Sequence, residues 1–394
     1  MGIKIVWSWS SLFLYFVLGL LSMWMIYHTM KEEQRIGRTV SWNNKYLIIV
    51  SLIWTFFATF RLVNFNGVGG MDANSYIYFF EKCNNRIYSG WMLHVGDDWI
   101  FKWTNKVIRF LTADYKIYFA LVYGFMAWAY LWFAVKFTPV KNNIVPYLLC
   151  FFLFWRSFNT LRSNFAIAFI MVSCAFMLDK KWRYAYCLAF LSGFIHKAAF
   201  LFALVVPFVQ IFSEYKLKIY HIVSFIILSG ILGGIFQQWF IQYASITDLQ
   251  GAYGSYASKS LEGGGFFSNF WKIAFEQMLL GVFMFFCKNK IECLKSHSES
   301  DSNRINIVWL ICVFDLILIP LCYILSIWRG YEIFYIPRIV MWGIILYIIL
   351  RKYRRLKNLM ALLIFLLFFF WFYFRIESMY ENSGLMPYVL EFLI

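Results

Sequence analysis

The chain has 394 residues, of which 62% are hydrophobic and 14% are charged, and its formal net charge at pH 7 is +16. Soluble proteins are about half apolar and about a quarter charged, so this composition excludes a soluble protein with one membrane anchor. Long apolar runs recur along the chain, for example over residues 5–27, 46–60 and 358–374. Because a membrane-spanning helix needs about 20 apolar residues, we predict a single all-α polytopic membrane domain over residues 1–394, with about 12 transmembrane helices.

The cysteines and the first apolar run narrow the class further. The eight cysteines are scattered, and their spacing matches neither a zinc site nor a disulfide framework. The run that follows Lys4 is too long for a signal peptide and lacks a small-residue cleavage site, so it predicts a first retained helix. We expect no metal site, no cofactor and no nucleic-acid partner.

Basic residues gather in short loops between the apolar runs, and this bias predicts the topology. By the positive-inside rule these loops are cytoplasmic, so both termini face outward and the number of helices is even. The basic loops contain Lys31, Arg35, Arg38 and Lys45; Lys136 and Lys141; Lys180, Lys181 and Arg183; Lys216 and Lys218; Lys288, Lys290, Lys295 and Arg304; and the segment 351–357.

Two apolar runs must each be broken for this alternation to hold. A single helix over residues 184–213 would span about 45 Å, which is long for a hydrocarbon core of about 30 Å. We therefore predict two short helices that meet near His196 and Lys197, and a similar break of residues 144–179 between Arg156 and Arg162. Irregular backbone at membrane depth requires protein or water to satisfy it, so we expect an outward-facing cavity lined by both breaks.

The first outer loop, residues 64–114, is the longest polar segment. A glycine-rich turn precedes Asp72, and Tyr76 follows four residues later. Asp72 can cap a short helix that runs to about residue 83, or it can act in catalysis, and these roles are compatible. Two adjacent carboxylates at Asp97 and Asp98 are a weak metal signal, so we interpret them as solvated loop charge. His94, Trp91, Trp99 and Trp103 also lie in this loop.

The segment RSFNTLRSNFAIAF, residues 156–169, carries two arginines at the predicted outer boundary. Arg162 stands at the start of a helix, where the macrodipole disfavours a cation, and a bound anion would resolve that conflict. The planar guanidinium also matches phosphate oxygens. The alternative is that Arg156 and Arg162 extend to lipid head groups.

Further candidates follow along the chain. His196 and Lys197 interrupt an apolar run, where ionisable groups usually line a functional cavity, although a lone histidine is often a packing residue. The segment WRGYEIFYIPRIVMW supplies Arg329, Tyr335 and Arg338, and Arg338 can instead pair with Glu332 or Asp315. Residues 242–265 form a second outer loop rich in glycine and serine.

Four of these segments together resemble the Wzy-type, EpsG-like family of O-antigen and exopolysaccharide polymerases. They are Arg61 ahead of the glycine turn with Asp72 and Tyr76, the segment LRSNFAIAFI, the segment FIHKAAF, and Pro387 and Tyr388 after the last helix. The order of the segments agrees across nearly the whole chain. Ser163 departs from the pattern, because family members often carry Gln at that position.

The resemblance implies a metal-independent membrane glycosyltransferase of the GT-C superfamily. Its partners would be the lipid bilayer and oligosaccharides linked to undecaprenyl diphosphate, with a flippase and a chain-length regulator as associated proteins. It would transfer a growing O-antigen, capsule or exopolysaccharide chain to a new lipid-linked unit on the outer face of the bacterial inner membrane.

This implied chemistry assigns roles to the candidates. Cations would stabilise the leaving diphosphate, and a carboxylate or an imidazole would act as the base. We predict Asp72 or His196 as the base, and diphosphate or substrate binding by Arg61, Arg156, Arg162, Lys197, Arg329, Arg338, Tyr76 and Tyr335. A flippase or transporter of the same lipid and an O-antigen ligase remain as alternatives, while the motifs of a membrane O-acyltransferase are not found.

Overall fold

The computed structural model describes most of the chain, and every structural statement concerns these residues. They are 4, 8–35, 42–64, 66–84, 98–138, 154–215, 217–246, 274–295, 299–325, 332–352 and 384–393. Their secondary structure is helical, apart from one isolated β-bridge between Arg61 and Leu390.

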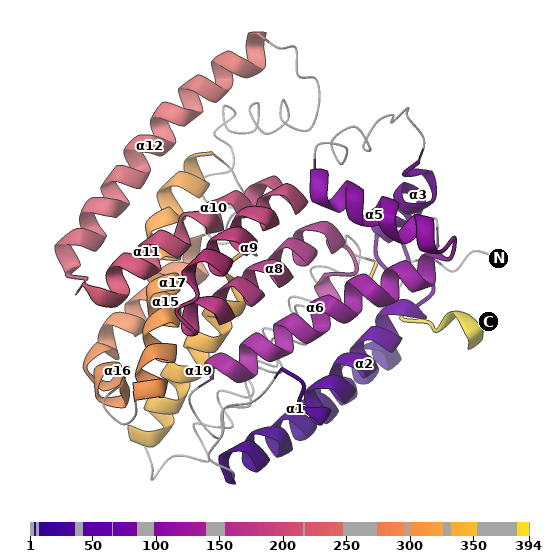
Figure 1. The fold of residues 1–394 in the computed structure, drawn as a ribbon, viewed down its shortest axis with the longest axis horizontal. Helices are drawn as coiled ribbons and strands as arrows, with labels where there is room; N and C mark the ends of the chain where they lie inside the picture. The colour runs from indigo at the N-terminus through magenta and orange to yellow at the C-terminus, as the bar shows by residue number, and fades with distance from the viewer. Residues whose placement is uncertain are drawn as a thin grey trace.

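The first group of helices lies side by side in the order α1, α2, α6, α8 and α9 (Figure 1). The short helices α3 and α5 lie next to the start of α6. The bounds in this part of the chain are α1 Trp9–Arg35, α2 Lys45–Thr59, α3 Ala73–Lys82, α5 Trp99–Leu111, α6 Tyr115–Phe137, α8 Leu161–Leu178 and α9 Trp182–Ile195.

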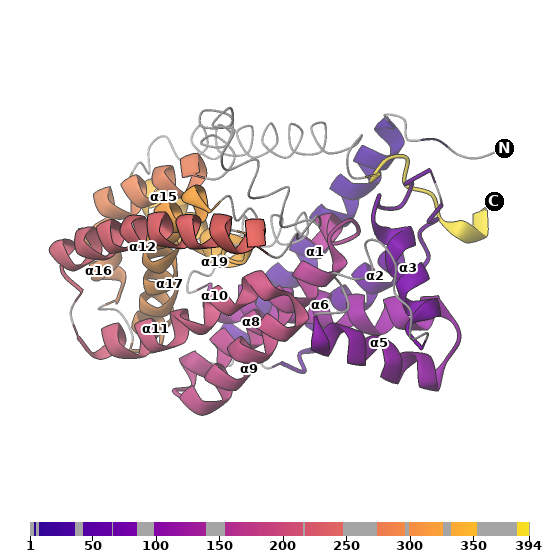
Figure 2. The same ribbon diagram turned by 90° about the horizontal axis from the view of Figure 1, so that it is seen from above.

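The second group is arranged around α17, which packs against α11, α12, α15, α16 and α19. Seen from above, this group lies beside the first, and α17 and α19 contact α6 at the junction (Figure 2). The bounds here are η1 Lys197–Ala199, α10 Phe200–Ala203, α11 Val205–Glu214, α12 Ile219–Ile246, α15 Phe275–Phe286, α16 Lys288–Lys295, α17 Glu299–Ile324, α19 Tyr335–Lys352 and η4 Glu391–Leu393.

Six of the described helical segments are long and apolar enough to cross a membrane. They are Trp9–His28, Tyr115–Phe137, Leu161–Leu178, Lys197–Glu214, Ile219–Gln238 and Ser302–Ile324. Three shorter apolar helices, α2, α15 and Tyr335–Ile349 within α19, accompany them. The predicted number of twelve also requires helices within residues 144–153 and 358–374, which lie outside the described residues.

Exposed apolar side chains fit a lipid environment rather than water. Along α12, for example, Ile227, Ile231 and Ile235 are all more than half exposed. A helix that is apolar all round is expected where every face meets lipid or protein. By contrast, most of α8 is buried, so α8 forms part of the interior of the bundle.

Both predicted helix breaks are present. The chain leaves helical geometry in the turn at residues 157–159 and resumes it at Leu161 in α8. The second break falls at His196, whose extended backbone (φ −152°, ψ 117°) separates α9 from η1 and the helices that follow. The predictions at these two points are therefore confirmed.

The two ends of the bundle differ in charge. At one end, which we call the lysine end, Lys136 pairs with Asp179 at 3.1 Å where α6 and α8 finish. Asn303 near the start of α17 donates to the carbonyl of Leu178 at the same end. The opposite end, which we call the arginine end, contains Arg61, Arg156, Arg162 and Arg338, at the end of α2 and at the starts of α8 and α19.

Residues 384–393, which we call the C-terminal strap, cross the arginine end of the first helix group. The amide of Leu62 donates to the carbonyl of Val389 at 2.7 Å, and the amide of Glu391 donates to Phe60 at 2.9 Å. Tyr388 donates its hydroxyl to the carbonyl of Phe57 at 2.7 Å. The strap therefore fixes the end of α2 to the loop that follows it.

Candidate functional site

The glycine turn after α2 is held directly against the break before α8. Gly69 and Gly70 adopt φ values of +84° and +121°, which side chains other than glycine rarely adopt. A Cβ atom on Gly70 would lie 2.4 Å from the carbonyl oxygen of Phe158. The amide of Asp72 donates a hydrogen bond of 3.0 Å to the side-chain oxygen of Asn159. Two segments that lie far apart in sequence therefore form one unit.

Asp72 occupies the N-cap position of α3, as predicted, but its side chain makes no capping hydrogen bond to that helix. Capping thus does not account for the carboxylate, which leaves the catalytic interpretation open. Tyr76, one turn later, is buried, and its ring meets Phe101 edge-on at a centroid distance of 6.1 Å. Tyr76 therefore packs α3 against α5.

Arg61 is fully buried between the glycine turn and α6. Its guanidinium donates to the carbonyls of Gly69 (2.6 Å) and Ala58 and to the hydroxyl of Tyr123 (2.8 Å). The ring of Phe158 lies 4.0 Å from the guanidinium carbon. Because its guanidinium joins the glycine turn to α2 and α6 through these hydrogen bonds, Arg61 is suited to holding the glycine turn in place.

Arg162 begins α8 and contacts Asp98, the residue before α5, at 2.6 Å. The side chains of Arg162 and Asp98 are 17% and 5% exposed. The anion that we expected beside Arg162 is thus supplied by the protein itself. The interpretation of Asp98 as solvated loop charge is wrong, because the arginine compensates the burial of this carboxylate.

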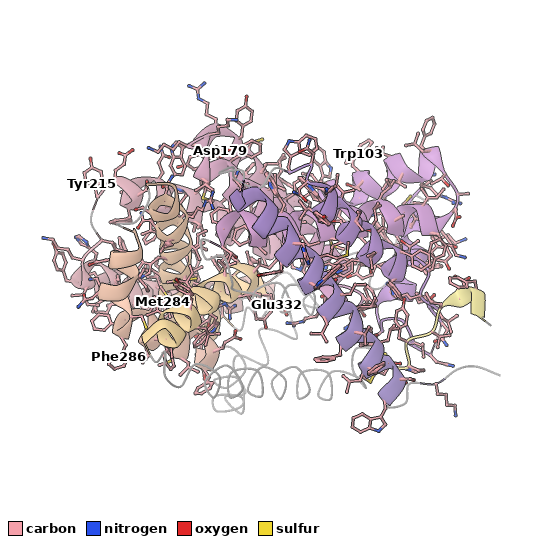
Figure 3. All side chains as sticks on the ribbon, turned by 90° about the horizontal axis from the view of Figure 1, so that it is seen from below. Trp103, Asp179, Tyr215, Met284, Phe286 and Glu332 are labelled. Carbon is pink, nitrogen blue, oxygen red and sulfur yellow. The ribbon has the colours of Figure 1, made fainter. Side chains whose placement is uncertain are left out.

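Arg156 reaches the start of α19. Its Nη2 atom lies 2.5 Å from Oε1 of Glu332, and its guanidinium lies 5.2 Å from the ring centroid of Tyr335. The side chains of Arg156 and Glu332 are 16% and 11% exposed. Glu332 lies in the interior between the two helix groups (Figure 3).

Arg338 also contacts Tyr335, at 4.6 Å from the same ring centroid, and is completely buried. Its Nε atom lies 3.1 Å from Asp315, and its Nη1 atom lies 3.6 Å from Glu276. Gln277 donates to the second oxygen of Asp315 at 2.6 Å. The predicted pairing of Arg338 with Asp315 is confirmed, whereas Glu332 pairs with Arg156.

A small hollow lies beside Arg156. Its volume is about 10 Å³, which is room for about one water molecule. Its lining consists of Tyr130, Arg156, Asn164, Ile167, Glu332, Tyr335 and Ile336. Neither His196 nor Lys197 takes part in this lining, so a cavity lined by both breaks stays a prediction.

His196 and Lys197 lie at the arginine end but on a different pair of helices. The Nδ1 atom of His196 accepts a hydrogen bond from the amide of Ala198 at 3.2 Å. In a neutral imidazole the other nitrogen then carries the proton. This arrangement makes Nε2 a donor, which suits an oxygen ligand better than it suits proton abstraction. Lys197 is exposed.

Several other predicted residues lie on the surface or outside the described residues. Trp99 and Trp103 on α5 are 62% and 54% exposed; Figure 3 labels Trp103. Arg329, Trp91, His94 and Asp97 lie outside the described residues. The first outer loop contains α3 and α5, so it is partly helical. The second loop, residues 242–265, is described only up to Ile246, where it is the end of α12.

A larger hollow, of about 280 Å³, lies at the lysine end. Residues from the end of α11, from α16 and from α17 line it, including Tyr215, Lys288, Glu292 and Trp309. In the described part of the chain, the predicted catalytic groups do not reach this hollow. Within the same residues, no group of three or more His, Cys, Asp or Glu side chains could hold a metal ion.

One protein family matches most of the chain. The EpsG family model matches residues 44–390, from the start of α2 to the C-terminal strap. The chain belongs to the EpsG family. No curated protein and no solved structure matches it. The matched region of this EpsG protein includes Arg61, Arg156, Arg162 and Arg338 of the arginine end.

Sequence reasoning missed the groups that join these candidates. Asn159, Asn164 and Tyr130 were not singled out, yet Asn159 holds Asp72, and Tyr130 donates to Asn164 at 2.8 Å beside the small hollow. A polar residue in an otherwise apolar helix was the available signal for Asn164. The role of Asn159 required the fold, because its partner lies 87 positions away.

Proposed function

We propose that this EpsG protein is a metal-independent membrane glycosyltransferase that polymerises a polysaccharide. It transfers the growing glycan from undecaprenyl diphosphate to a sugar of a second lipid-linked unit. The observation that carries the proposal is the group of carboxylate-paired arginines at one end of an apolar helical bundle, within the region that matches the family. Ionisable groups at membrane depth are costly, and they are retained where they serve a function.

The leaving group of this reaction explains the need for cations. When an acceptor hydroxyl attacks the anomeric carbon, the bond to the diphosphate breaks and negative charge develops on phosphate oxygens. Guanidinium groups in a poorly solvated site stabilise such charge strongly. Arg156 is placed first for this role, since it lines the small hollow and contacts the side chains of Glu332 and Tyr335 there. Arg162 is second, at the start of α8.

Arg61 and Arg338 fit a supporting role better. Arg61 donates to backbone carbonyls and to the hydroxyl of Tyr123, and Arg338 is buried in contact with two carboxylates. We assign both as positioning residues, which hold the glycine turn and the start of α19. Lys197 and Arg329 remain candidate contacts to the substrate.

For the base, the hydrogen bond at His196 leaves Asp72 as the better candidate. Asp72 stands beside the 157–160 turn, and its side chain does not cap α3. A carboxylate within hydrogen-bond reach of the acceptor hydroxyl can take its proton as the glycosidic bond forms. His196 instead fits a donor to a sugar or phosphate oxygen.

The lysine end supplies the orientation in the membrane. Lys136, Lys180, Lys181 and Arg183 lie there, and the positive-inside rule places that end in the cytoplasm. The arginine end then faces outward, where newly flipped lipid-linked units arrive. A flippase and a chain-length regulator are the partners that such a reaction needs.

The test is complementation of a bacterial strain that lacks its own polymerase and makes the matching repeat unit. Glycan ladders on a gel report the chain length directly. Restored long chains support a polymerase, and single repeat units with the protein present in the membrane contradict it. Units attached singly to lipid A-core would indicate a ligase.

A flippase is the competing function, and the hollow at the lysine end is the observation in its favour. A transporter must expose its site to both faces, and a hollow near the cytoplasmic end would serve that purpose. A strain that lacks both its flippase and its polymerase should accumulate lipid-linked units on the inner leaflet. If this protein reversed that accumulation, the result would decide for transport.

A further inference from the structure

Arg156 and Glu332 form the shortest ion pair at the small hollow. The atoms Nη2 and Oε1 are 2.5 Å apart, and the two side chains are only 16% and 11% exposed. In the described part of the chain, Glu332 is held through Oε1 alone. Asp315 differs, because Arg338 and Gln277 engage both of its oxygens. Glu332 can therefore leave its arginine with fewer contacts broken than Asp315 can.

The hollow is too small for a substrate while this pair is closed. Its volume of about 10 Å³ accommodates about one water molecule. A diphosphate group needs far more space than that, so it can reach Arg156 only if the side chain of Glu332 withdraws. Binding at this arginine therefore requires the exchange of one anion for another.

Such an exchange is favourable where the simple loss of a partner is not. Removing one member of a buried ion pair leaves an uncompensated charge in a poorly solvated place, and this is strongly unfavourable. A diphosphate that replaces the carboxylate keeps the guanidinium paired throughout. When the product leaves, the returning carboxylate again removes the cost of an unpaired cation.

We propose that Glu332 is the counter-ion that Arg156 exchanges for the diphosphate, and that its return releases undecaprenyl diphosphate after transfer. This inference rests on the proposed function. It makes Glu332 a positioning residue, since it acts through Arg156 and not on the sugars. Its loss should therefore trap the product while leaving the chemical step intact.

The test compares Glu332→Gln with the wild-type protein, purified and reconstituted in lipid nanodiscs. The probe for binding is undecaprenyl diphosphate itself, and the probe for turnover is a lipid-linked repeat unit. Asp179→Asn is the matched control, because it removes one carboxylate from an ion pair at the opposite end. Thermal unfolding of each variant verifies the fold.

The proposal predicts that Glu332→Gln binds undecaprenyl diphosphate at least about 10-fold more tightly, because a neutral amide competes poorly for a guanidinium. Steady-state turnover should fall by at least about 10-fold, since release limits it. The rate of the first turnover should stay within about twofold of wild type. Asp179→Asn should match the wild type in all three measurements.

Equal or weaker binding of undecaprenyl diphosphate by a folded Glu332→Gln protein would overturn the proposal. A fall in the first turnover equal to the fall in steady state would overturn it as well. If Glu332→Gln does not fold, Glu332→Asp is the deciding variant, because a shorter carboxylate competes less well for the guanidinium of Arg156. Tighter binding of undecaprenyl diphosphate than in wild type supports the exchange, and unchanged binding contradicts it. A wild-type protein that neither binds the lipid nor polymerises would instead reject the proposed function.

Discussion

The backbone amide of Asp72 donates a hydrogen bond of 3.0 Å to the side-chain oxygen of Asn159. Asp72 follows the glycine turn after α2, and Asn159 lies in the break before α8. The same break places Arg156 against Glu332 and brings Phe158 onto Gly70. One short turn therefore sets the position of Asp72, the candidate base, relative to Arg156, the candidate residue that binds the diphosphate.

Replacing Asn159 tests this relationship. Asn159→Ala should lower polymer formation by about 10- to 100-fold at normal protein levels, because a shift of about 1 Å in a catalytic group can cost that much. Asn159→Asp keeps an accepting oxygen and should retain more activity than Asn159→Ala. Asn303→Ala removes an amide that bonds to the backbone at the lysine end, and it should have no effect. Wild-type chain lengths from Asn159→Ala would contradict the role.

The glycine turn offers a second test, with a matched glycine elsewhere. Gly70→Ala places a Cβ atom 2.4 Å from the carbonyl oxygen of Phe158 at a φ of +121°, so the turn must separate from the break. Backbone strain of this kind costs about 1–3 kcal/mol. We expect a lower thermal unfolding temperature and shorter glycan chains.

Gly234→Ala is the control for that substitution. Its Cβ atom meets nothing within 4 Å on α12, and alanine favours a helix over glycine by about 1 kcal/mol. Its unfolding temperature should be equal to or above that of wild type. Gly70→Ala with normal stability and full-length glycan would show that contact between turn and break is dispensable.

The buried pair of Arg338 and Asp315 should be coupled in stability. Arg338→Leu leaves an unpaired carboxylate in the interior and should cost about 3–5 kcal/mol. The double variant with Asp315→Leu should lose less than the sum of the two single variants, because no uncompensated pair member remains apart from Glu276. Denaturation of the four proteins in one detergent gives the coupling energy, and strict additivity would show that the 3.1 Å contact contributes nothing.

Tyr388 predicts a dependence of stability on alkaline pH. Burial raises the pKa of its phenol well above the usual value, and the positive charge of Arg61 only partly opposes this. Above about pH 10 the unfolded protein therefore releases a proton that the folded protein keeps, and stability falls as pH rises. Tyr388→Phe should show a smaller drop in unfolding temperature between pH 8 and pH 11.

The same variant has a cost at neutral pH. It leaves the carbonyl of Phe57 without its 2.7 Å partner, which is worth about 1 kcal/mol. An alkaline drop identical to that of wild type would mean that the phenol of Tyr388 does not contribute. The exposed Tyr215→Phe is the control and should alter neither value.

The sequence predicted the features that depend on local pattern. The apolar runs, the helix breaks at 157–160 and at His196, and Asp315 as one of two candidate partners of Arg338 all follow from an ionisable or polar residue interrupting an apolar segment. Such interruptions can be recognised from the sequence alone, because the free-energy cost of an ionisable group in an apolar segment is set by the membrane and not by a particular neighbour.

The contacts between distant segments were not predictable in this way. Asp98 reads as loop charge until the fold brings it to the start of α8, where Arg162 pairs with it. Glu332 and Arg156 are 176 positions apart, and either could have paired elsewhere. Arg61 was predicted to bind substrate, and its Nε atom donates to the carbonyl of Gly69, which only the folded glycine turn brings within reach.

The most direct test of the account measures both products of the reaction at once. The purified protein is reconstituted with lipid-linked repeat units, and glycosidic linkages and released undecaprenyl diphosphate are counted together. The account predicts one diphosphate lipid per linkage, a loss of both by at least about 100-fold in Arg156→Ala, and no loss in Arg183→Ala, whose side chain is exposed at the lysine end. Long chains formed at the wild-type rate by a folded Arg156→Ala protein would contradict it.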